Sequence, residues 1–374
     1  MLNEEQKMLQ ETAKKFAEEI VAPRAVEIDE MEEFPHDIYQ KMAEVGFLGL
    51  TLGEEYGGIG ADALSFSLVV EELSKASAAI GNAMCVAIEQ AEFISHFGTQ
   101  EQKEKYVPKI VSGEIIPAFA LTENGAGSDS GALKLSAVRD GDDYILNGTK
   151  IFITMGQVCD LAIVFARTAD LGTKGVSAFL VEKGTPGFSV GSKEKILGIR
   201  GLGTSELVFD DVRVPASAMV GEENKGFKLA MAGLDTGRIA MASMALGIAE
   251  AALEAAIEYS KTRVQFGQPI CKFQGIQFML ADMATAVQAS KLLIHDAAEK
   301  KNSGERFSQE ASMAKLFTTD TAMKVATDAV QIFGGYGYSM EYPVQKYFRE
   351  AKLPQIFEGT NQIQRMLIGR NLTR

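Results

Sequence analysis

The stretch PQIFEGTNQIQR, residues 354–365, places a single carboxylate, Glu358, on a connector between two predicted helices. Pro354 ends the preceding helix, because proline lacks an N–H group and restricts the residue before it. Thr360 or Asn361 can cap the following helix. That helix has three apolar residues at helical spacing: Ile363, Met366 and Leu367. The sequence therefore predicts an acidic side chain that a helix on each side holds in place.

Two interpretations of Glu358 follow from its neighbours. Near the start of a helix, the helix dipole stabilises a carboxylate and lowers its pKa. Beside Ile356 and Phe357, the same carboxylate would lose water and act as a general base with a raised pKa. Gly359 would let another backbone or a ligand approach closely. The two interpretations shift the pKa in opposite directions, and this stretch alone leaves both open.

Composition limits the class of protein. With 374 residues, the chain is longer than one compact core usually holds, so we expect two or three subdomains. The net charge of −13 argues against nucleic acid and anionic membranes as partners. The three cysteines are widely spaced, which indicates a reducing compartment without disulfides. Neither they nor the three histidines have the spacing of metal ligands, so no metal is expected.

The hydrophobic pattern indicates neither a signal peptide nor a membrane span. The first residues, MLNEEQK, are acidic and helical in pattern. The longest uncharged apolar run, 239–249, is too short to cross a bilayer.

The first part of the chain, residues 1–117, has apolar residues every three to four positions. Helices are expected at 63–76, 78–97 and 101–111. In the first of these helices, Glu71 and Glu72 are expected to point toward solvent. This part is predicted to be an N-terminal α-helical domain.

Residues 118–224 have the alternation and the turn residues of a β domain. Strands are expected at 118–122, 136–139, 144–154, 161–167, 175–182, 188–192 and 205–214. In the last of these, Leu207, Phe209 and Val212 alternate with acidic residues. The pattern predicts a β-barrel or sandwich between helical regions.

Residues 225–374 return to long helices, which are expected at about 226–263, 275–302 and 308–333. Small residues along these helices suit close packing, and the segment 241–247 suggests a buried helix that could lie at a subunit interface. The fold class is therefore α+β, with an N-terminal α-helical domain, a middle β-barrel or sandwich domain and a C-terminal four-helix bundle.

Two segments of the β domain have residue types that can bind a phosphate or a flat heterocycle. Residues 119–129 follow a strand and are dense in glycine and hydroxyl groups, so their backbone N–H groups can face a ligand. The segment Phe152-Ile153-Thr154 ends a strong strand, where an aromatic ring could pack on a flat ligand and a hydroxyl could donate to it. Each segment alone is equally compatible with an ordinary turn or with core.

Three segments of the C-terminal part stand out. Asp235 and Arg238 lie three residues apart in a helix and are expected to form only an exposed, weak ion pair. Residues 263–269 form a turn with one cation, and Gln274 starts the following helix. Residues 331–337 end a helix with three glycines, more than a helix end requires.

Taken together and in this order, these segments resemble the acyl-CoA dehydrogenases, flavoproteins that desaturate acyl-CoA thioesters. The similarity covers essentially the whole chain and is strongest to the short-chain (butyryl-CoA) branch. Its most specific parts are residues 121–123 with 126–129, 263–267, 331–335 and 357–360. The resemblance implies FAD as cofactor, acyl-CoA as substrate and assembly as a homotetramer or dimer.

The resemblance assigns site residues in three groups. It implies FAD contacts within one chain for Phe119, Leu121, Thr122, Gly127, Ser128, Phe152, Ile153, Thr154, Thr360 and Gln362. It implies contacts that reach FAD from a neighbouring subunit for Arg263, Phe266, Gln274, Gln331, Ile332, Gly334 and Gly335. It implies acyl-CoA contacts for Ser128, Leu234, Asp235, Arg238, Phe357 and Gly359.

In this family resemblance, Glu358 is the catalytic base, which takes the α-proton of the thioester while the β-hydrogen leaves as hydride to flavin N5. Bound acyl-CoA is expected to bury Glu358 and thereby raise its pKa. In the free enzyme the pKa of Glu358 is expected to be more ordinary. Some branches carry the base at the position of Gly237, where this chain has no acid. Met155 and Phe357 stand where relatives often have asparagine and tyrosine, and neither touches the proton or hydride.

The expected substrate is a neutral, short acyl-CoA, which would be oxidised to trans-2-enoyl-CoA in fatty acid β-oxidation. The helix at 78–97 resembles the one that lines the far end of the acyl cavity. It has no Lys or Arg to pair with a second carboxylate, and Glu89 and Glu92 further disfavour such a group.

The resemblance also implies electron-transferring flavoprotein as the electron acceptor, and a bacterial cytoplasmic or mature mitochondrial matrix location. Two alternatives stay open. An acyl-CoA oxidase would use the same base and flavin but pass electrons to oxygen; such enzymes usually have a large extra C-terminal domain that we do not expect here. A non-catalytic helical binding protein would share the fold alone.

Overall fold

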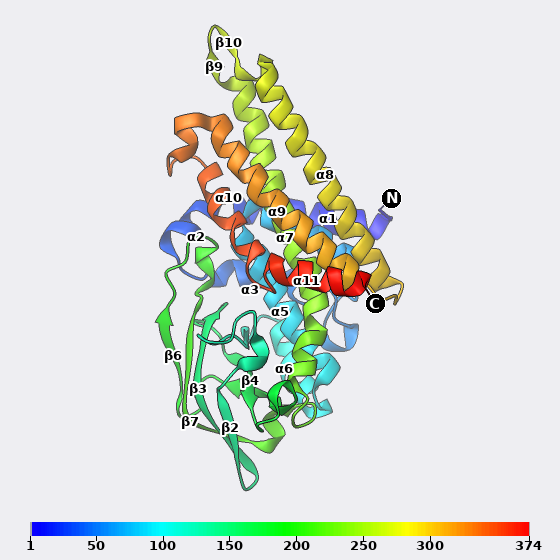
Figure 1. The fold of residues 1–374 in the computed structure, drawn as a ribbon, viewed down its shortest axis with the longest axis vertical. Coiled ribbons are helices and arrows are strands. Elements are labelled where there is room, and N and C mark those ends of the chain that lie inside the picture. The colour runs from blue at the N-terminus through cyan, green and yellow to red at the C-terminus, as the bar shows by residue number, and fades with distance from the viewer. Residues whose placement is uncertain (1, 374) are drawn as a thin grey trace.

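The protein is elongated, and its helices and its β-sheet occupy different regions (Figure 1). The computed structural model describes residues 2–373. Met1 and Arg374, which begin and end the predicted first and last domains, lie outside the described residues. A helical part, a β-rich part and a second helical part follow one another along the chain, which confirms the predicted α+β class.

The N-terminal part is built around two apolar helices. Its helices are α1 (Glu4–Phe16), α2 (Ala25–Met31), α3 (His36–Glu44), α4 (Ala63–Ala76), α5 (Ala78–Phe97) and α6 (Gln100–Val111). Nearly all residues of α4 and most residues of α5 are buried, because these helices are apolar on most sides. Asp62 caps α4 by accepting a hydrogen bond from the Ser65 N–H group at 2.7 Å.

The middle part is a single sheet. Its strands are β1 (Pro117–Ala120), β2 (Ser136–Asp140), β3 (Asp143–Ile153), β4 (Leu161–Arg167), β5 (Val176–Glu182), β6 (Phe188–Lys193), β7 (Ser205–Pro215) and β8 (Met219–Val220). Their order is β6-β7-β3-β2-β4-β5-β8, and β1 pairs with β4 in parallel. The predicted strands all appear, whereas the pattern does not predict the two-residue β8. Leu207, Phe209 and Val212 are buried, as their alternation predicts.

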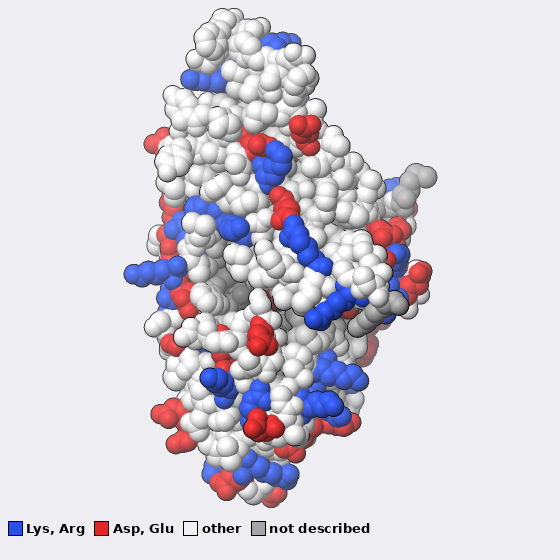
Figure 2. Space-filling model, in the orientation of Figure 1, with Lys and Arg blue, Asp and Glu red and all other residues white. Residues whose placement is uncertain are grey.

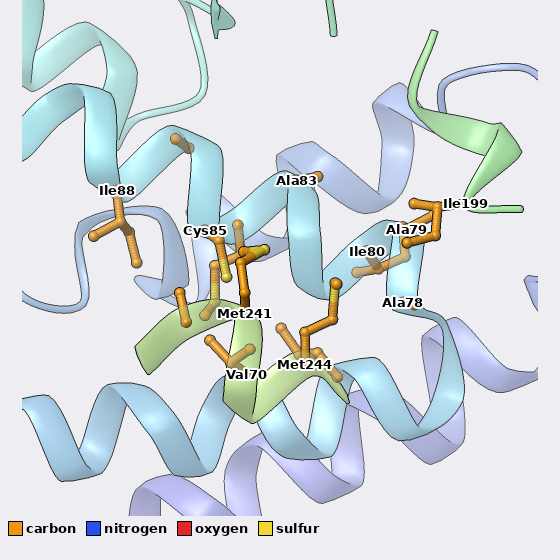
Figure 3. Close-up of a cluster of buried hydrophobic side chains, with 14 of the residues drawn as sticks. Val70, Ala78, Ala79, Ile80, Ala83, Cys85, Ile88, Ile199, Met241 and Met244 are labelled. Atoms are coloured by element: carbon orange, nitrogen blue, oxygen red, sulfur yellow. The ribbon is translucent and has the colours of Figure 1, made fainter. Parts of the chain in front are cut away.

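The C-terminal part consists of long helices that pack lengthwise. Its helices are α7 (Gly226–Thr262), α8 (Gln274–Asn302), α9 (Ser308–Phe333), α10 (Val344–Ala351) and α11 (Asn361–Leu372). α9 packs against the other four, and α7 also packs against α4 and α5. In Figure 3, Met241 and Met244 of α7 point into a cluster with Val70 of α4 and Ile80 of α5. The small residues at 241–247 are therefore buried within this chain, and their burial requires no subunit interface.

The predicted exposure of Glu71 and Glu72 is wrong, since both side chains are buried. Glu71 accepts a hydrogen bond from Lys291 of α8, and Glu72 accepts one from Gln10 of α1 at 2.9 Å. The helices α1, α7 and α8 all pack on α4, so no face of α4 is left for solvent.

One ion cluster joins the three parts of the chain. Asp29 of α2 accepts hydrogen bonds from Arg200, which follows β6, at 2.8 Å and from Arg349 of α10 at 2.6 Å. Burial opposes ionisation of this carboxyl, but the two arginines outweigh it and lower the pKa of Asp29 to about 2. Asp29 therefore stays ionised across the physiological range and ties α2, the β domain and α10 together.

The change of secondary structure falls beside the predicted domain boundaries, because β1 begins at Pro117 and α7 begins at Gly226. The boundaries themselves, 117/118 and 224/225, stay predictions. Among the described residues, α7 is the one helix long and apolar enough to span a membrane, but 78% of its most apolar window is buried inside the protein. Such burial is typical of a core helix.

Candidate active site

The connector that carries Glu358 runs between α10 and α11, as the sequence predicts. α10 ends at Ala351, and a short 3-10 turn at Leu353–Gln355 contains the predicted helix-ending proline. Thr360 is the residue that caps α11, because its hydroxyl accepts from the Ile363 N–H group at 3.3 Å. Glu358 has φ of 52° and Gly359 has φ of 86°, so two successive residues are left-handed. A non-glycine residue adopts this conformation at a cost, and its surroundings must hold it there.

The predicted apolar contact face of α11 is only partly correct. Ile363 and Leu367 are half-buried and Met366 is exposed, whereas Asn361 and Gln364 are fully buried. Asn361 donates to Thr319 at 2.9 Å and to Asp320 at 2.8 Å, both on α9. α9 presents polar groups to the start of α11. Hydrogen bonds from Asn361 to these groups therefore form the contact that apolar residues were expected to make.

Glu358 faces Gly237 of α7. A Cβ atom at Gly237 would lie 3.3 Å from Oε2 of Glu358 and 3.5 Å from Oε1 of Glu89, which comes from α5. The glycine therefore leaves open the space between two carboxylates. Figure 2 shows this side of the molecule hollowed between the β domain and the C-terminal helices, beside the connector.

Both carboxylates are largely removed from water. Burial raises the pKa of Glu358, although Lys315 and Arg238 act in the opposite direction. Burial and the charge of Glu358 together raise the pKa of Glu89 well above its ordinary range, and Oε1 of Glu89 has no hydrogen-bond partner among the described residues. The protein's own groups thus already raise the pKa of Glu358, whereas the sequence predicts an ordinary value before acyl-CoA binds.

Ile356 contributes less to this environment than predicted. Its side chain is 50% exposed, while Phe357 is half-buried. Glu358 itself is half-buried, and helices from other parts of the chain bring Glu89, Gly237 and Lys315 close to it.

The expectation that Asp235 and Arg238 form an exposed ion pair is wrong. The Arg238 side chain is buried and pairs with Asp235, and the Asp235 carboxylate also accepts from the Ser308 hydroxyl at 3.0 Å. The Nε atom of Arg238 has no partner among the described residues. A buried guanidinium with a free N–H beside Glu358 is suited to hold an anionic or carbonyl group of a ligand. Leu234, one turn earlier on α7, is half-buried.

A buried ion pair fixes the predicted loop of the β domain. Lys150 is fully buried and donates to the Leu121 carbonyl at 2.9 Å and to Glu123 at 2.8 Å. The Glu123 carboxylate also accepts from the N–H groups of Lys134 and Leu135. Gly127 and Ser128, which follow the residues held by this ion pair, are exposed. Sequence reasoning missed this ion pair, because Glu123 lies in the loop after β1 and Lys150 lies within β3, 27 residues further along the chain.

Phe152 and Thr154 lie where a flat ligand can reach them. Phe152 has φ of 55° and its ring is 57% exposed, and Thr154 is partly exposed. An exposed aromatic ring on a strained backbone beside a hydroxyl fits the edge and face of a flavin ring. Phe119 is half-buried and packs on Phe165, with ring centroids 4.8 Å apart.

Not every predicted cofactor residue offers its side chain. Leu121, Ile153 and Ile332 are buried in the core, so only their backbone atoms could contact a cofactor. Thr122 is partly buried, and its carbonyl accepts from the Ile151 N–H group at 2.9 Å. Gln362 is exposed on the first turn of α11.

The second predicted group of cofactor residues lies at the far end of the C-terminal helices. A hairpin of β9 (Val264–Gln265) and β10 (Gln268–Pro269) carries Phe266 at its tip, where the ring is 93% exposed. Arg263 stacks over the Tyr336 ring at 5.3 Å, next to Gly334 and Gly335, and Gln274 and Gln331 are exposed. Figure 1 places this hairpin at the opposite end of the molecule from the β domain. One chain therefore does not bring the two groups of predicted cofactor residues together.

Three family models match the chain in order. They are described as acyl-CoA dehydrogenase N-terminal domain at residues 3–114, middle domain at 118–212 and C-terminal domain at 224–373. The short-chain specific acyl-CoA dehydrogenase of Clostridium acetobutylicum is 46% identical over 380 residues, which cover 100% of this chain and 99% of that protein.

Two solved structures match the chain over its whole length. Butyryl-CoA dehydrogenase from Megasphaera elsdenii is 47% identical with a TM-score of 0.98, and the match covers 100% of this chain and 99% of that one. A chain from work on the electron transferring flavoprotein of Acidaminococcus fermentans is 49% identical with a TM-score of 0.98 and the same coverage.

The fold and these matches define an oxidoreductase of an FAD-dependent class. The chain belongs to the acyl-CoA dehydrogenase family. The resemblance and the cofactor inferred from the sequence are thereby confirmed, while the role of each site residue stays a prediction.

Proposed function

We propose that this protein oxidises a neutral, short acyl-CoA to trans-2-enoyl-CoA, with Glu358 as the base that removes the α-proton. The observation that carries this proposal is the Glu358 carboxylate in the space above Gly237, where burial raises its pKa. A base with a pKa raised toward the working pH takes a carbon-bound proton more readily than an ordinary carboxylate.

The surrounding residues have distinct tasks in this proposal. The left-handed backbone at Glu358 aims its side chain at Gly237, and the lack of a side chain at Gly237 admits the thioester. Arg238 has a free N–H group for the substrate. Bound FAD supplies the acceptor for the hydride that leaves the β-carbon. Ser128, Leu234, Asp235, Phe357 and Gly359 complete the proposed acyl-CoA contacts.

FAD binding is proposed to need more than one subunit. Phe119 to Ser128, Phe152 to Thr154 and Thr360 to Gln362 would contact FAD from one chain. Arg263, Phe266, Gln274 and residues 331–335 would contact the FAD of a neighbour, which fits their position on an exposed hairpin far from the β domain. We therefore propose a homotetramer, or at least a dimer.

The test of the function is anaerobic addition of acyl-CoAs to the purified holoenzyme while the flavin absorbance near the visible maximum is followed. Butyryl-CoA is expected to bleach the flavin quickly. If no acyl-CoA in a panel of neutral chain lengths bleaches it, the proposed activity is wrong and a non-catalytic binding protein becomes the better explanation.

Glutaryl-CoA is expected to reduce the flavin at least about 100-fold more slowly than pentanoyl-CoA, because its distal carboxylate would lie against α5, which has no Lys or Arg to pair with it. The charged residue that α5 brings to Gly237 is an acid, Glu89, whose Oε1 atom is already buried without a hydrogen-bond partner among the described residues. Pentanoyl-CoA is the matched control, since it has the same chain length without the charge. Stopped-flow reduction rates check this, and equal rates would exclude the neutral-substrate assignment.

The proposed electron acceptor is electron-transferring flavoprotein. A highly similar chain comes from work on such a flavoprotein, which supports this partner. We expect slow reoxidation of the reduced, ligand-bound enzyme in air and fast reoxidation by the flavoprotein. Rapid reoxidation by oxygen alone would instead identify an acyl-CoA oxidase. A cytoplasmic location stays part of the proposal.

A further inference from the structure

Lys315 of α9 differs from the other fully buried lysines. Lys150 pairs with Glu123 and Lys346 pairs with Glu350, each at 3.0 Å or less. Lys315 has no exposed surface, yet among residues 2–373 no carboxylate lies within ion-pair distance of it. Burying an ammonium group without a carboxylate partner costs free energy. The groups that Lys315 contacts therefore indicate its role.

The partners of Lys315 belong to the connector of Glu358. Its Nζ atom donates to the Gly359 carbonyl at 2.7 Å and to Oδ1 of Asn361 at 3.0 Å. Gln364 donates to the same Gly359 carbonyl at 3.0 Å and to the Glu358 carbonyl at 3.3 Å. The two left-handed residues are thus fixed through their carbonyl groups. When Lys315 is protonated, the donor from α9 is charged, which makes its hydrogen bonds stronger.

The charge of Lys315 also acts on the Glu358 carboxylate. Of the groups that lower the pKa of Glu358, Lys315 has the larger effect and Arg238 of α7 the smaller. Burial lowers the pKa of Lys315 itself to about 7, Glu358 and Asp320 of α9 oppose this, and Arg238 adds to it. Two groups of α5, Glu89 and the Cys85 thiol, also face Glu358, and its charge adds to the effect of burial in raising the pKa of each.

We propose that Lys315 is the positioning residue of the active site: its ammonium group holds the Glu358–Gly359 turn in the left-handed conformation and supplies positive charge to the Glu358 carboxylate. The proposal rests on the proposed function of Glu358 as the base. In this proposal Lys315 acts through the connector, to which both of its hydrogen bonds go.

The test is the Lys315→Met holoenzyme, which keeps the length of the side chain and removes its charge and donors. Anaerobic flavin reduction by butyryl-CoA is expected to slow by about 100-fold, because a small displacement of the base costs that much. The acidic limb of the pH–rate profile is expected to move up by about one pH unit, since the carboxylate loses an opposite charge. The FAD content is expected to stay the same.

The double variant Lys346→Met with Glu350→Gln is the matched control, because it removes another buried lysine without leaving a buried charge unpaired. Lys346 is not among the charges that act on Glu358. The control is expected to keep the wild-type pH profile whatever its stability. A shift of the acidic limb in the control equal to that in Lys315→Met would overturn the proposal, since the shift would then be a general effect of core disruption.

The outcomes separate this inference from the function it rests on. If the wild-type flavin is not bleached by any acyl-CoA, the proposed function fails first. If the wild type is bleached and Lys315→Met matches it in rate and pH profile, only the positioning role is wrong. If Lys315→Met does not fold, Lys315→Gln is measured in the same way, and a wild-type profile there overturns the proposal.

Discussion

Glu358→Gln is expected to lower the rate of flavin reduction by butyryl-CoA by about 10⁴-fold, the upper range for loss of a general base. Glutamine has nearly the same shape but cannot accept the α-proton. Glu89 is the other carboxylate beside Gly237, and burial raises its pKa, which makes it a poorer proton acceptor than an ionised carboxylate. FAD binding is expected to persist, because the backbone of the connector is held by Lys315 and Gln364 rather than by the Glu358 side chain.

The measurement is anaerobic stopped-flow reduction with the flavin content determined on the same sample. Glu72→Gln is the matched control: Glu72 is also buried with a raised pKa, but it bonds Gln10 far from the connector. The control is expected to reduce at the wild-type rate. A Glu358→Gln enzyme that reduces within tenfold of the wild type would show that another group takes the proton.

Asp29→Asn is expected to lower the free energy of unfolding by about 3 kcal/mol, because removing one partner of a buried ion cluster leaves the others unpaired. Arg200 and Arg349 both bond this carboxylate, and Asp29 is nearly fully buried. Asp37 on α3 pairs with Arg24 at the surface, so Asp37→Asn is the matched control and is expected to change stability by less than about 1 kcal/mol.

The stabilisation by Asp29 has a defined pH window. The folded pKa of about 2 lies below the ordinary value of 3.8, so the contribution is complete above pH 4 and is lost as the pH falls toward 2. Asp29→Asn should therefore show a weaker fall of stability over this interval than the wild type. Urea unfolding at several pH values measures this, and parallel pH dependences of the two proteins would contradict it.

Much of the fold was predictable from the sequence because local patterns carry it. The helical pattern of 63–76 predicts α4 with its observed bounds, and the alternation in 205–214 predicts the buried face of β7. The connector of Glu358 was predictable for the same reason, since a proline, a glycine and a capping hydroxyl lie within a few residues of one another. Only the family resemblance shows that Gly237 occupies the position where some relatives carry the base, and that this chain has no second acid there.

The charged residues of the interior were not predictable in this way. Glu71 and Glu72 have the sequence surroundings of exposed acids, and Asp235 with Arg238 has the spacing of a surface pair. Helices from distant parts of the chain nevertheless bury Glu71, Glu72 and Arg238, and Asp235 is half-buried. Hydrophobic periodicity reports only which face of an element is apolar. It carries no information on a polar face that becomes buried because its partners arrive from elsewhere.

The sequence by itself thus determined the order of elements, the place of Glu358 on a capped connector and the family. The tertiary structure decided which charges surround that carboxylate: Glu89 from α5, Arg238 from α7 and Lys315 from α9. The physical reason is that the pKa and the aim of a side chain depend on groups within a few ångströms, and here those groups come from helices far apart in the chain.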